Sequence, residues 1–139
     1  MKRLFWLGIF LTVTAGCVPL LVGAGVASSA AAGKKTPAQA VEVNKKNLSN
    51  LTYGIGKNFA EEVMGKKPIK AYRNKQEVVI PNPYRTENFL KGQKSCEVLF
   101  YATEVVADDD QFTDEELTPL VFADGVLAGC GWKTYHEAR

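Results

Sequence analysis

Histidine is nearly absent from the sequence. The chain of 139 residues contains one, His136, among its last four residues. Because chain ends fray, we do not expect a catalytic histidine there. Without it, no Ser/His/Asp or Cys/His catalytic set can be assembled, and no zinc-ligand spacing is present. A glycine-rich phosphate loop after a predicted strand is also missing. We therefore predict that the protein is not an enzyme and binds no metal and no cofactor.

Charge is absent from the N-terminal region between Arg3 and Lys34. Residues 4–13 form an apolar segment of the length found in signal peptides, about 7–15 residues, and small residues and Cys17 follow it. Two other interpretations compete with a signal peptide ending before Cys17. Residues 4–26 are long enough for an uncleaved membrane helix, which needs about 20 residues. Ordinary signal cleavage near residues 30–32 would need an unusually long apolar segment.

The stretch VTAGC, at residues 13–17, resembles a bacterial lipobox, whose cysteine receives a diacylglyceryl group. We favour this interpretation: a signal peptide at 1–16, lipid attachment at Cys17, and a flexible tether over 17–46. Val18 follows the cysteine, and by resemblance to the lipoprotein sorting rule this favours the periplasmic face of the outer membrane. The membrane would then be a partner through the lipid.

Cysteines are few, and their number is odd: Cys17, Cys96 and Cys130. Lipidation of Cys17 would leave a pair. The predicted strand register places Cys130 opposite Pro119 and Cys96 about seven residues further along the first strand, far beyond the ~7 Å between Cα atoms that a disulfide tolerates. We therefore predict two unpaired, buried thiols.

Charges of opposite sign are separated along the chain. Residues 44–94 contain 11 basic and 4 acidic residues, a net charge of +7, whereas residues 95–139 contain 2 basic and 10 acidic residues, a net charge of −8. Residues 66–75 alone hold five basic residues. Since an exported protein does not meet nucleic acid, anionic lipid headgroups are the better partner for that segment if its charges are not simply solvated.

The rest of the sequence predicts an α+β fold. Apolar residues at helical spacing predict a helix over 55–64 that Gly65 ends, with a further short helix before it. Residues 76–80 form a β-branched run, and the segments 97–105, 119–123 and 126–131 predict an antiparallel meander with an Asp124-Gly125 type I′ turn. We expect one or two N-terminal helices on a meander of three to four strands. One face of the sheet would pack on the 55–64 helix, and residues 76–90 or a protein partner would cover the other.

Six carboxylates lie within residues 108–116. Calcium binds clustered carboxylates, but Phe112 and Thr113 stand where an EF-hand loop requires an oxygen ligand and a glycine. A solvated loop fits better, followed by a capping box with Thr113 as N-cap and Glu116 three residues on.

Residues 47–65, NLSNLTYGIGKNFAEEVMG, resemble the opening of the SmpA/OmlA, or BamE-like, outer-membrane lipoprotein domains. EVLFYATE and DEELTPLVFADGVLAGCGW, together with NPYRTE at 82–87, look closer to a related, uncharacterised family of small lipoproteins. The resemblance implies a small α+β domain over 47–139. Its motif positions would be Gly54, Gly65, Asp124, Gly125, Gly129, Gly131 and Trp132, and its partner-binding positions Tyr84, Arg85 and Tyr101.

These observations predict a lipid-anchored binding or scaffold protein of the bacterial envelope, with a protein partner and a role in outer-membrane assembly or maintenance. A periplasmic inhibitor or ligand-binding module is the alternative, and a protein held by a membrane helix is a third possibility.

Overall fold

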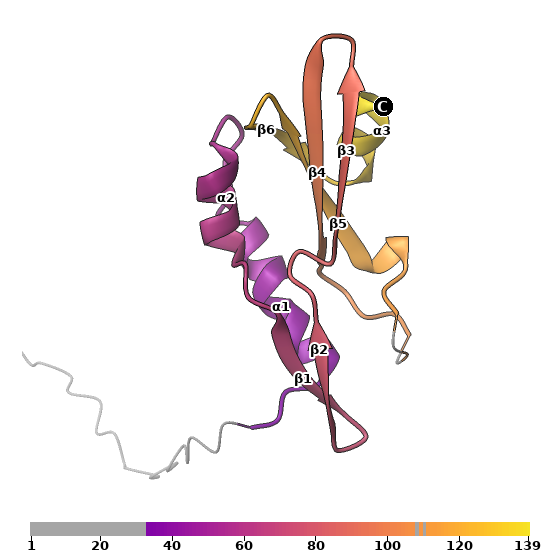
Figure 1. Cartoon of the computed structure of the whole chain (residues 1–139). Coiled ribbons are helices and arrows are strands. Elements are labelled where there is room, and N and C mark those ends of the chain that lie inside the picture. Colours follow the sequence, from indigo (N-terminus) through magenta and orange to yellow (C-terminus); the bar gives the residue numbers. More distant parts are fainter. Residues whose placement is uncertain (1–32, 108, 110) are drawn as a thin grey trace, which may run out of the picture. The chain divides into compact units, whose positions relative to one another are not determined.

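The fold was obtained as a computed structural model, which describes residues 33–107, 109 and 111–139. The described residues form an α+β fold, as the sequence predicts, with three α-helices, a two-stranded sheet and a four-stranded sheet (Figure 1). In chain order the elements are α1 (Pro37–Leu48), α2 (Lys57–Met64), β1 (Ile69–Arg73), β2 (Gln76–Ile80), β3 (Arg85–Lys91), β4 (Lys94–Ala102), the short 3-10 helix η1 (Asp114–Glu116), β5 (Leu117–Ala123), β6 (Val126–Cys130) and α3 (Trp132–Ala138). None of the described helices is long and apolar enough to cross a membrane.

Helix α1 occupies much of the predicted tether, so that prediction is wrong over residues 37–46. Thr36 and Gln39 form a reciprocal capping box, and Pro37 stands in the first turn, where its missing N–H costs nothing. The helix buries Ala40 and Val41 in the core of the domain. The folded domain therefore begins near residue 33 and not at residue 47.

Strands β4, β5 and β6 form the predicted meander, and β3, which the sequence did not predict as a strand, adds a fourth; the strands follow in sequence order, all antiparallel. Asp124 and Gly125 have φ values of 49° and 79°, which confirms the type I′ turn between β5 and β6. Strand β2 has the predicted bounds. The hairpin of β1 and β2 is a separate small sheet whose turn, Asn74-Lys75, also has two positive φ values.

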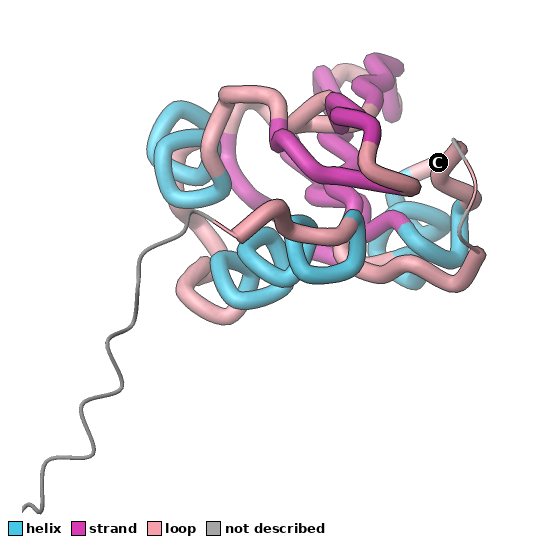
Figure 2. The backbone as a smooth tube through the Cα atoms, turned by 90° about the horizontal axis from the view of Figure 1, so that it is seen from below, coloured by secondary structure: helices cyan, strands magenta, loops and turns pink. Residues whose placement is uncertain are grey.

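The two central strands of the large sheet, β4 and β5, are buried on both faces. Figure 2 shows helices flanking the strands on more than one side. Residues from α2, β4, β5 and β6 form one core cluster: Ala60, Met64, Leu99, Tyr101, Leu120, Phe122 and Leu127. The alternate residues of β4 and β5 form a second cluster with α1, β1, β2 and α3: Ala40, Val41, Ala71, Ile80, Val98, Phe100, Ala102, Leu117, Val121 and Tyr135.

The second face is covered in part as predicted, because Ile80 of β2 lies in its core cluster and Val78, Tyr84 and Phe89 pack against it. Helix α3, which the sequence analysis missed, supplies Tyr135 to that face, and the 85–91 segment is itself the fourth strand. At the other side of the sheet, residues 54–57 bond to the outer edge of β6: Gly54 N–H donates to Leu127 O at 2.9 Å, and Leu127 N–H donates to Ile55 O at 2.8 Å. This short segment protects the edge of β6 from pairing with other chains.

The two described cysteines do not form a disulfide. Cys96 on β4 pairs with Ala123, and Cys130 on β6 pairs with Leu120 because a bulge between Val121 and Phe122 shifts the register by one residue. Strand β5 lies between them, which alone separates their backbones by about 9–10 Å. The predicted lack of a bridge is confirmed. The predicted burial holds for Cys96 only, since Cys130 is exposed.

Candidate functional site

The predicted lipid-attachment residue Cys17 lies outside the described residues, as do the predicted signal peptide at 1–16 and residues 17–32 of the predicted tether. These predictions therefore stay predictions.

Most of the predicted motif glycines lie where the backbone has positive φ. Gly54, Gly65 and Gly131 have φ values of 84°, 85° and 89°. Gly65 ends α2, and Gly131 stands between β6 and α3. Residues other than glycine rarely adopt such φ values, so these glycines shape turns of the fold rather than a binding site.

Gly129 and Trp132 join helix α3 to the sheet. A Cβ on Gly129 would come within 2.7 Å of Thr134 Cγ2, so only glycine lets α3 approach this closely. The Trp132 Nε1–H donates to Leu117 O at 2.9 Å, and its ring lies 5.7 Å from that of Phe100. Both motif residues therefore have a structural explanation.

The prediction that Tyr101 binds a partner is wrong. Its side chain is fully buried in the core between α2 and the sheet, and its hydroxyl has no hydrogen-bond partner among the described residues. Burial raises the pKa of the Tyr101 hydroxyl far above its usual range, and the nearby Glu61 carboxylate adds to this. Alternation along β4 turns Tyr101 toward α2, a face that the sequence alone did not assign.

Tyr84 and Arg85, the other two predicted partner-binding residues, are half-buried and make contacts within the domain. The Tyr84 hydroxyl accepts a hydrogen bond from Phe112 N–H at 3.2 Å, and the two rings meet edge to face at 5.3 Å. The Arg85 guanidinium lies 4.1 Å from the centre of the Phe100 ring and 3.0 Å from Asp114 Oδ1. Both residues thus hold the acidic loop against the sheet.

Glu116 organises that loop from inside. Its carboxylate is 1% exposed and accepts hydrogen bonds from the N–H groups of Val106, Ala107 and Thr113 at 2.6, 3.2 and 2.8 Å. Burial by itself would raise the pKa of Glu116, but these N–H groups outweigh burial and hold the pKa below its ordinary value. The predicted capping box of Thr113 and Glu116 is confirmed. Among the described residues, no His, Cys, Asp or Glu cluster is placed to hold a metal.

Asn44 and Asn82 form a buried polar link that the sequence analysis missed. The Asn44 amide donates to Asn82 Oδ1 and to Ala102 O, both at 2.9 Å. The Asn82 amide in turn donates to Gly65 O at 3.1 Å. This link ties α1, the end of α2, the β2–β3 loop and the end of β4 together. An asparagine on the apolar face of α1 was the sequence signal for it.

Two of the surface depressions of the described domain are candidates for contacts with a small ligand or a protein partner. One, which we name the Trp132 depression, has a volume of about 260 Å³, lies between η1 and α3 and is lined by Asp114, Glu115, Trp132 and His136. The rings of Trp132 and His136 lie 6.0 Å apart there. An aromatic wall beside two carboxylates is suited to a cationic group and offers no nucleophile paired with a base.

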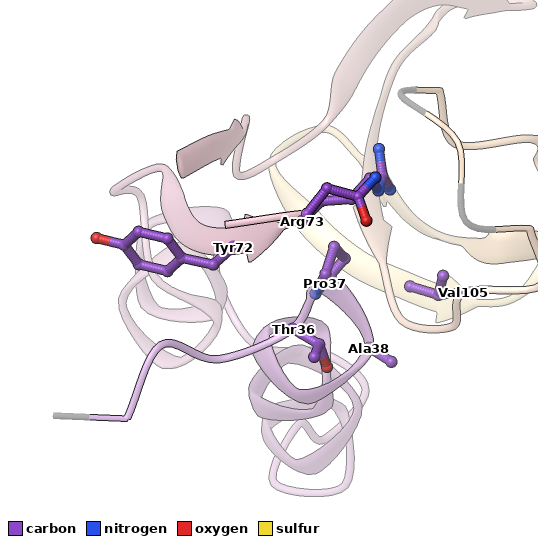
Figure 3. Close-up of a pocket in the computed structure, with 7 residues that line it drawn as sticks. Thr36, Pro37, Ala38, Tyr72, Arg73 and Val105 are labelled. Carbon is purple, nitrogen blue, oxygen red and sulfur yellow. The ribbon is translucent and has the colours of Figure 1, made fainter. Parts of the chain in front are cut away.

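The other depression is a groove of about 360 Å³ between the first turn of α1, the end of β1 and Val105 (Figure 3). Thr36, Pro37 and Ala38 form one side, and Tyr72, Arg73 and Asn74 come from the hairpin. Its lining is mainly apolar, with the Arg73 side chain at the rim. It is the size of a side-chain or short-peptide contact rather than of a deep catalytic cleft.

Comparison with known proteins places the chain in a family. Residues 23–137 match DUF3192, a family of proteins of unknown function. The chain belongs to this family. No curated protein and no solved structure shows a significant match to the chain. The DUF3192 match begins before α1, which agrees with a domain that starts earlier than residue 47.

Proposed function

We propose that this DUF3192 protein is a lipid-anchored binding or scaffold protein of the bacterial envelope, attached through Cys17 to the periplasmic face of the outer membrane. One observation carries the proposal: a compact domain from residue 33 onward follows a short apolar segment that ends in VTAGC. In the anchored form, the 16 residues from 18 to 33 connect the lipid to the domain. They span at most about 55 Å, so the domain works close to the membrane.

The surface of the domain supports binding as its mode of action. Its depressions are shallow and combine aromatic, carboxylate and basic groups, the groups that dock side chains of another protein. The Trp132 depression is a candidate contact for a cationic side chain of such a partner. The resemblance to BamE-like domains adds the expectation that the partner belongs to outer-membrane assembly or maintenance.

Metabolic labelling with a palmitate analogue tests the anchor. We expect the wild type to take up label and Cys17→Ser to take up none, because the thioether and the new N-terminus both need that cysteine. Cys130→Ser is the matched control, since Cys130 is an exposed thiol in the folded domain and should leave labelling unchanged. A wild type without label would overturn the lipoprotein assignment, and intact mass would then show whether residues 1–16 are retained.

Crosslinking in intact cells followed by purification tests the binding role. We expect the wild type to capture one envelope protein reproducibly. Capture should be lost when residues of the Trp132 depression are replaced, for example by Glu115→Lys, which reverses a charge there. Consistent absence of any crosslinked envelope protein would contradict a scaffold function.

A further inference from the structure

The first described residues of the domain are fixed to the hairpin of β1 and β2. Tyr72 N–H donates to Lys35 O at 2.7 Å, so the backbone at Lys35 continues the edge of β1. The Lys34 ammonium lies 4.9 Å from the centre of the Tyr72 ring. Thr36 then caps α1. The uncharged N-terminal segment therefore joins the domain at the outer edge of this hairpin, whichever way that segment is held.

The surface beside this junction is basic. Lys34, Lys35, Lys70 and Tyr72 line a broad depression together with Gly33. Lys75, in the hairpin turn, is exposed as well. We name the set Lys34, Lys35, Lys70, Tyr72, Lys75 and Val79 the basic hairpin surface.

The negative charge of the acidic residue of the hairpin, Glu77, is already paired within the hairpin. Glu77 Oε1 lies 3.0 Å from Lys70 Nζ, and Glu77 Oε2 accepts a hydrogen bond from the Tyr72 hydroxyl at 3.0 Å. These two partners hold the pKa of Glu77 below its ordinary value, Lys70 contributing most. The carboxylate thus does not repel a negatively charged surface as a free one would.

The same surface also presents apolar groups to solvent. Val79 is paired with Lys70 across the hairpin, and 57% of it is exposed. Tyr72 is half-exposed beside them. Lysines around a tyrosine and an exposed aliphatic side chain match the headgroup region of a bilayer, where tyrosine is enriched and each basic residue near an anionic surface contributes about 1 kcal/mol.

We propose that the basic hairpin surface rests on anionic phospholipid headgroups and so fixes the orientation of the anchored domain. This inference rests on the proposed anchoring at the N-terminus, because the anchor brings this surface to the membrane. The orientation turns the opposite end of the domain, with the β3–β4 turn and α3, away from the lipid (Figure 1). It leaves the Trp132 depression on α3 open to a partner.

Fluorescence quenching at two matched positions tests the orientation. Gln76→Cys places a label at the β1–β2 turn, and Gln93→Cys places one at the β3–β4 turn, both at exposed glutamines. The full chain is purified with its anchor, in a Cys130→Ser background, and reconstituted into vesicles that contain a nitroxide-labelled lipid. We expect at least twofold stronger quenching at position 76 than at 93 in vesicles with 30% phosphatidylglycerol. The difference should disappear in pure phosphatidylcholine and at about 1 M salt, where screening acts within ~3 Å.

Charge removal identifies the residues responsible. Lys34→Gln/Lys35→Gln should abolish the excess quenching at position 76, whereas Lys46→Gln/Lys94→Gln, which removes the same charge elsewhere, should retain it. Equal quenching at 76 and 93, or quenching that ignores lipid charge, would overturn the proposal in favour of a protein contact. The quenching experiment gives an answer whether the N-terminus is held by a lipid or by a membrane helix. Failure of the Cys17 assignment is detected by palmitate labelling instead, so the two failures can be distinguished.

Discussion

At the scale of the residue, two buried polar side chains position the segments around the sheet. Asn44 links α1 to the end of β4. Glu116 holds the loop that precedes β5, because its carboxylate accepts hydrogen bonds from three backbone N–H groups. Buried polar groups are stable only when they are hydrogen-bonded, so each makes its surrounding segment adopt one conformation.

The Glu116 carboxylate gives a prediction with a defined pH dependence. Glu116→Gln should lower the free energy of unfolding by about 2 kcal/mol at pH 7, because hydrogen bonds to a charged acceptor contribute about 1.5–3 kcal/mol. The folded pKa lies below the ordinary value of 4.5, so the ionised group adds stability above that value and loses it as pH falls through the folded pKa. Urea unfolding of both proteins should therefore show the difference narrowing from pH 7 toward pH 3.

Glu115→Gln is the matched control for that measurement, since Glu115 is the exposed neighbour in the same short helix. Its effect should stay within about 0.5 kcal/mol, as for most surface substitutions. An equal loss for both variants, or a Glu116→Gln difference that does not change with pH, would contradict the role given to the buried carboxylate.

At the scale of the element, the sequence predicts what strong local signals specify. The strand at 76–80, the Asp124-Gly125 turn and the helix ending at Gly65 are all present, because β-branched runs, positive-φ turns and C-terminal glycines act locally. The Thr36-Pro37-Ala38-Gln39 sequence is also a local signal for the start of α1, but it lies in a stretch of small polar residues whose composition is equally typical of a linker. Strands β1 and β3 have weak alternation and many polar residues, so only their partner strands identify them.

The candidate site was predictable to a lesser degree. Tyr84 and Arg85 lie at the surface but contact the acidic loop, and Tyr101 faces the core. Both faces of β4 are covered, one by α2 and the other by α1, the β1–β2 hairpin and α3, and periodicity within the strand does not specify which element covers which face. The Trp132 depression joins η1 to α3, two elements that lie close only after the meander has formed.

Helix α3 gives a prediction about its close approach to β6. Gly129→Ala should lower the free energy of unfolding by about 1–3 kcal/mol, the usual cost of overpacking, because the new Cβ meets the Thr134 side chain. Thr134→Ala removes the two nearest atoms, so the double variant should regain most of this loss. Denaturation of the four proteins of the cycle, followed by Trp132 fluorescence, measures the coupling. Additive effects would show that α3 does not contact β6 in this way.

At the scale of the whole molecule, one four-stranded sheet separates two cores that different parts of the chain complete. The first helices and the β1–β2 hairpin lie N-terminal to the sheet, and the closing helix lies C-terminal to it. Because the core on one face needs both α1 and α3, the domain requires nearly all of residues 37–138 to fold. Truncation to the predicted boundary at residue 47 would remove Val41 from that core and would also remove the buried Asn44 with its hydrogen bonds.

The architecture predicts the reactivity of the two cysteines of the domain. Cys130 on β6 is exposed and Cys96 on β4 is 4% exposed. We expect one thiol of the domain to react rapidly with a maleimide in the native state and the second to react only in urea. Cys130→Ser should eliminate the rapid reaction. Mass spectrometry of the labelled protein measures both, and two slow thiols or a disulfide in the unreduced protein would contradict the register of the sheet.

The hydrogen bond between Tyr72 and Lys35 has a mechanical consequence. Tension applied at the N-terminal end of the described domain acts first on this edge contact, on the contact of Lys34 with the Tyr72 ring, and on the cap of α1. The four-stranded sheet carries load only after α1 has been pulled away from it, since the chain reaches the sheet through α1, α2 and the hairpin. Under tension from the N-terminal end, the contacts at Tyr72 and the start of α1 should therefore separate at a lower force than the strands of the four-stranded sheet.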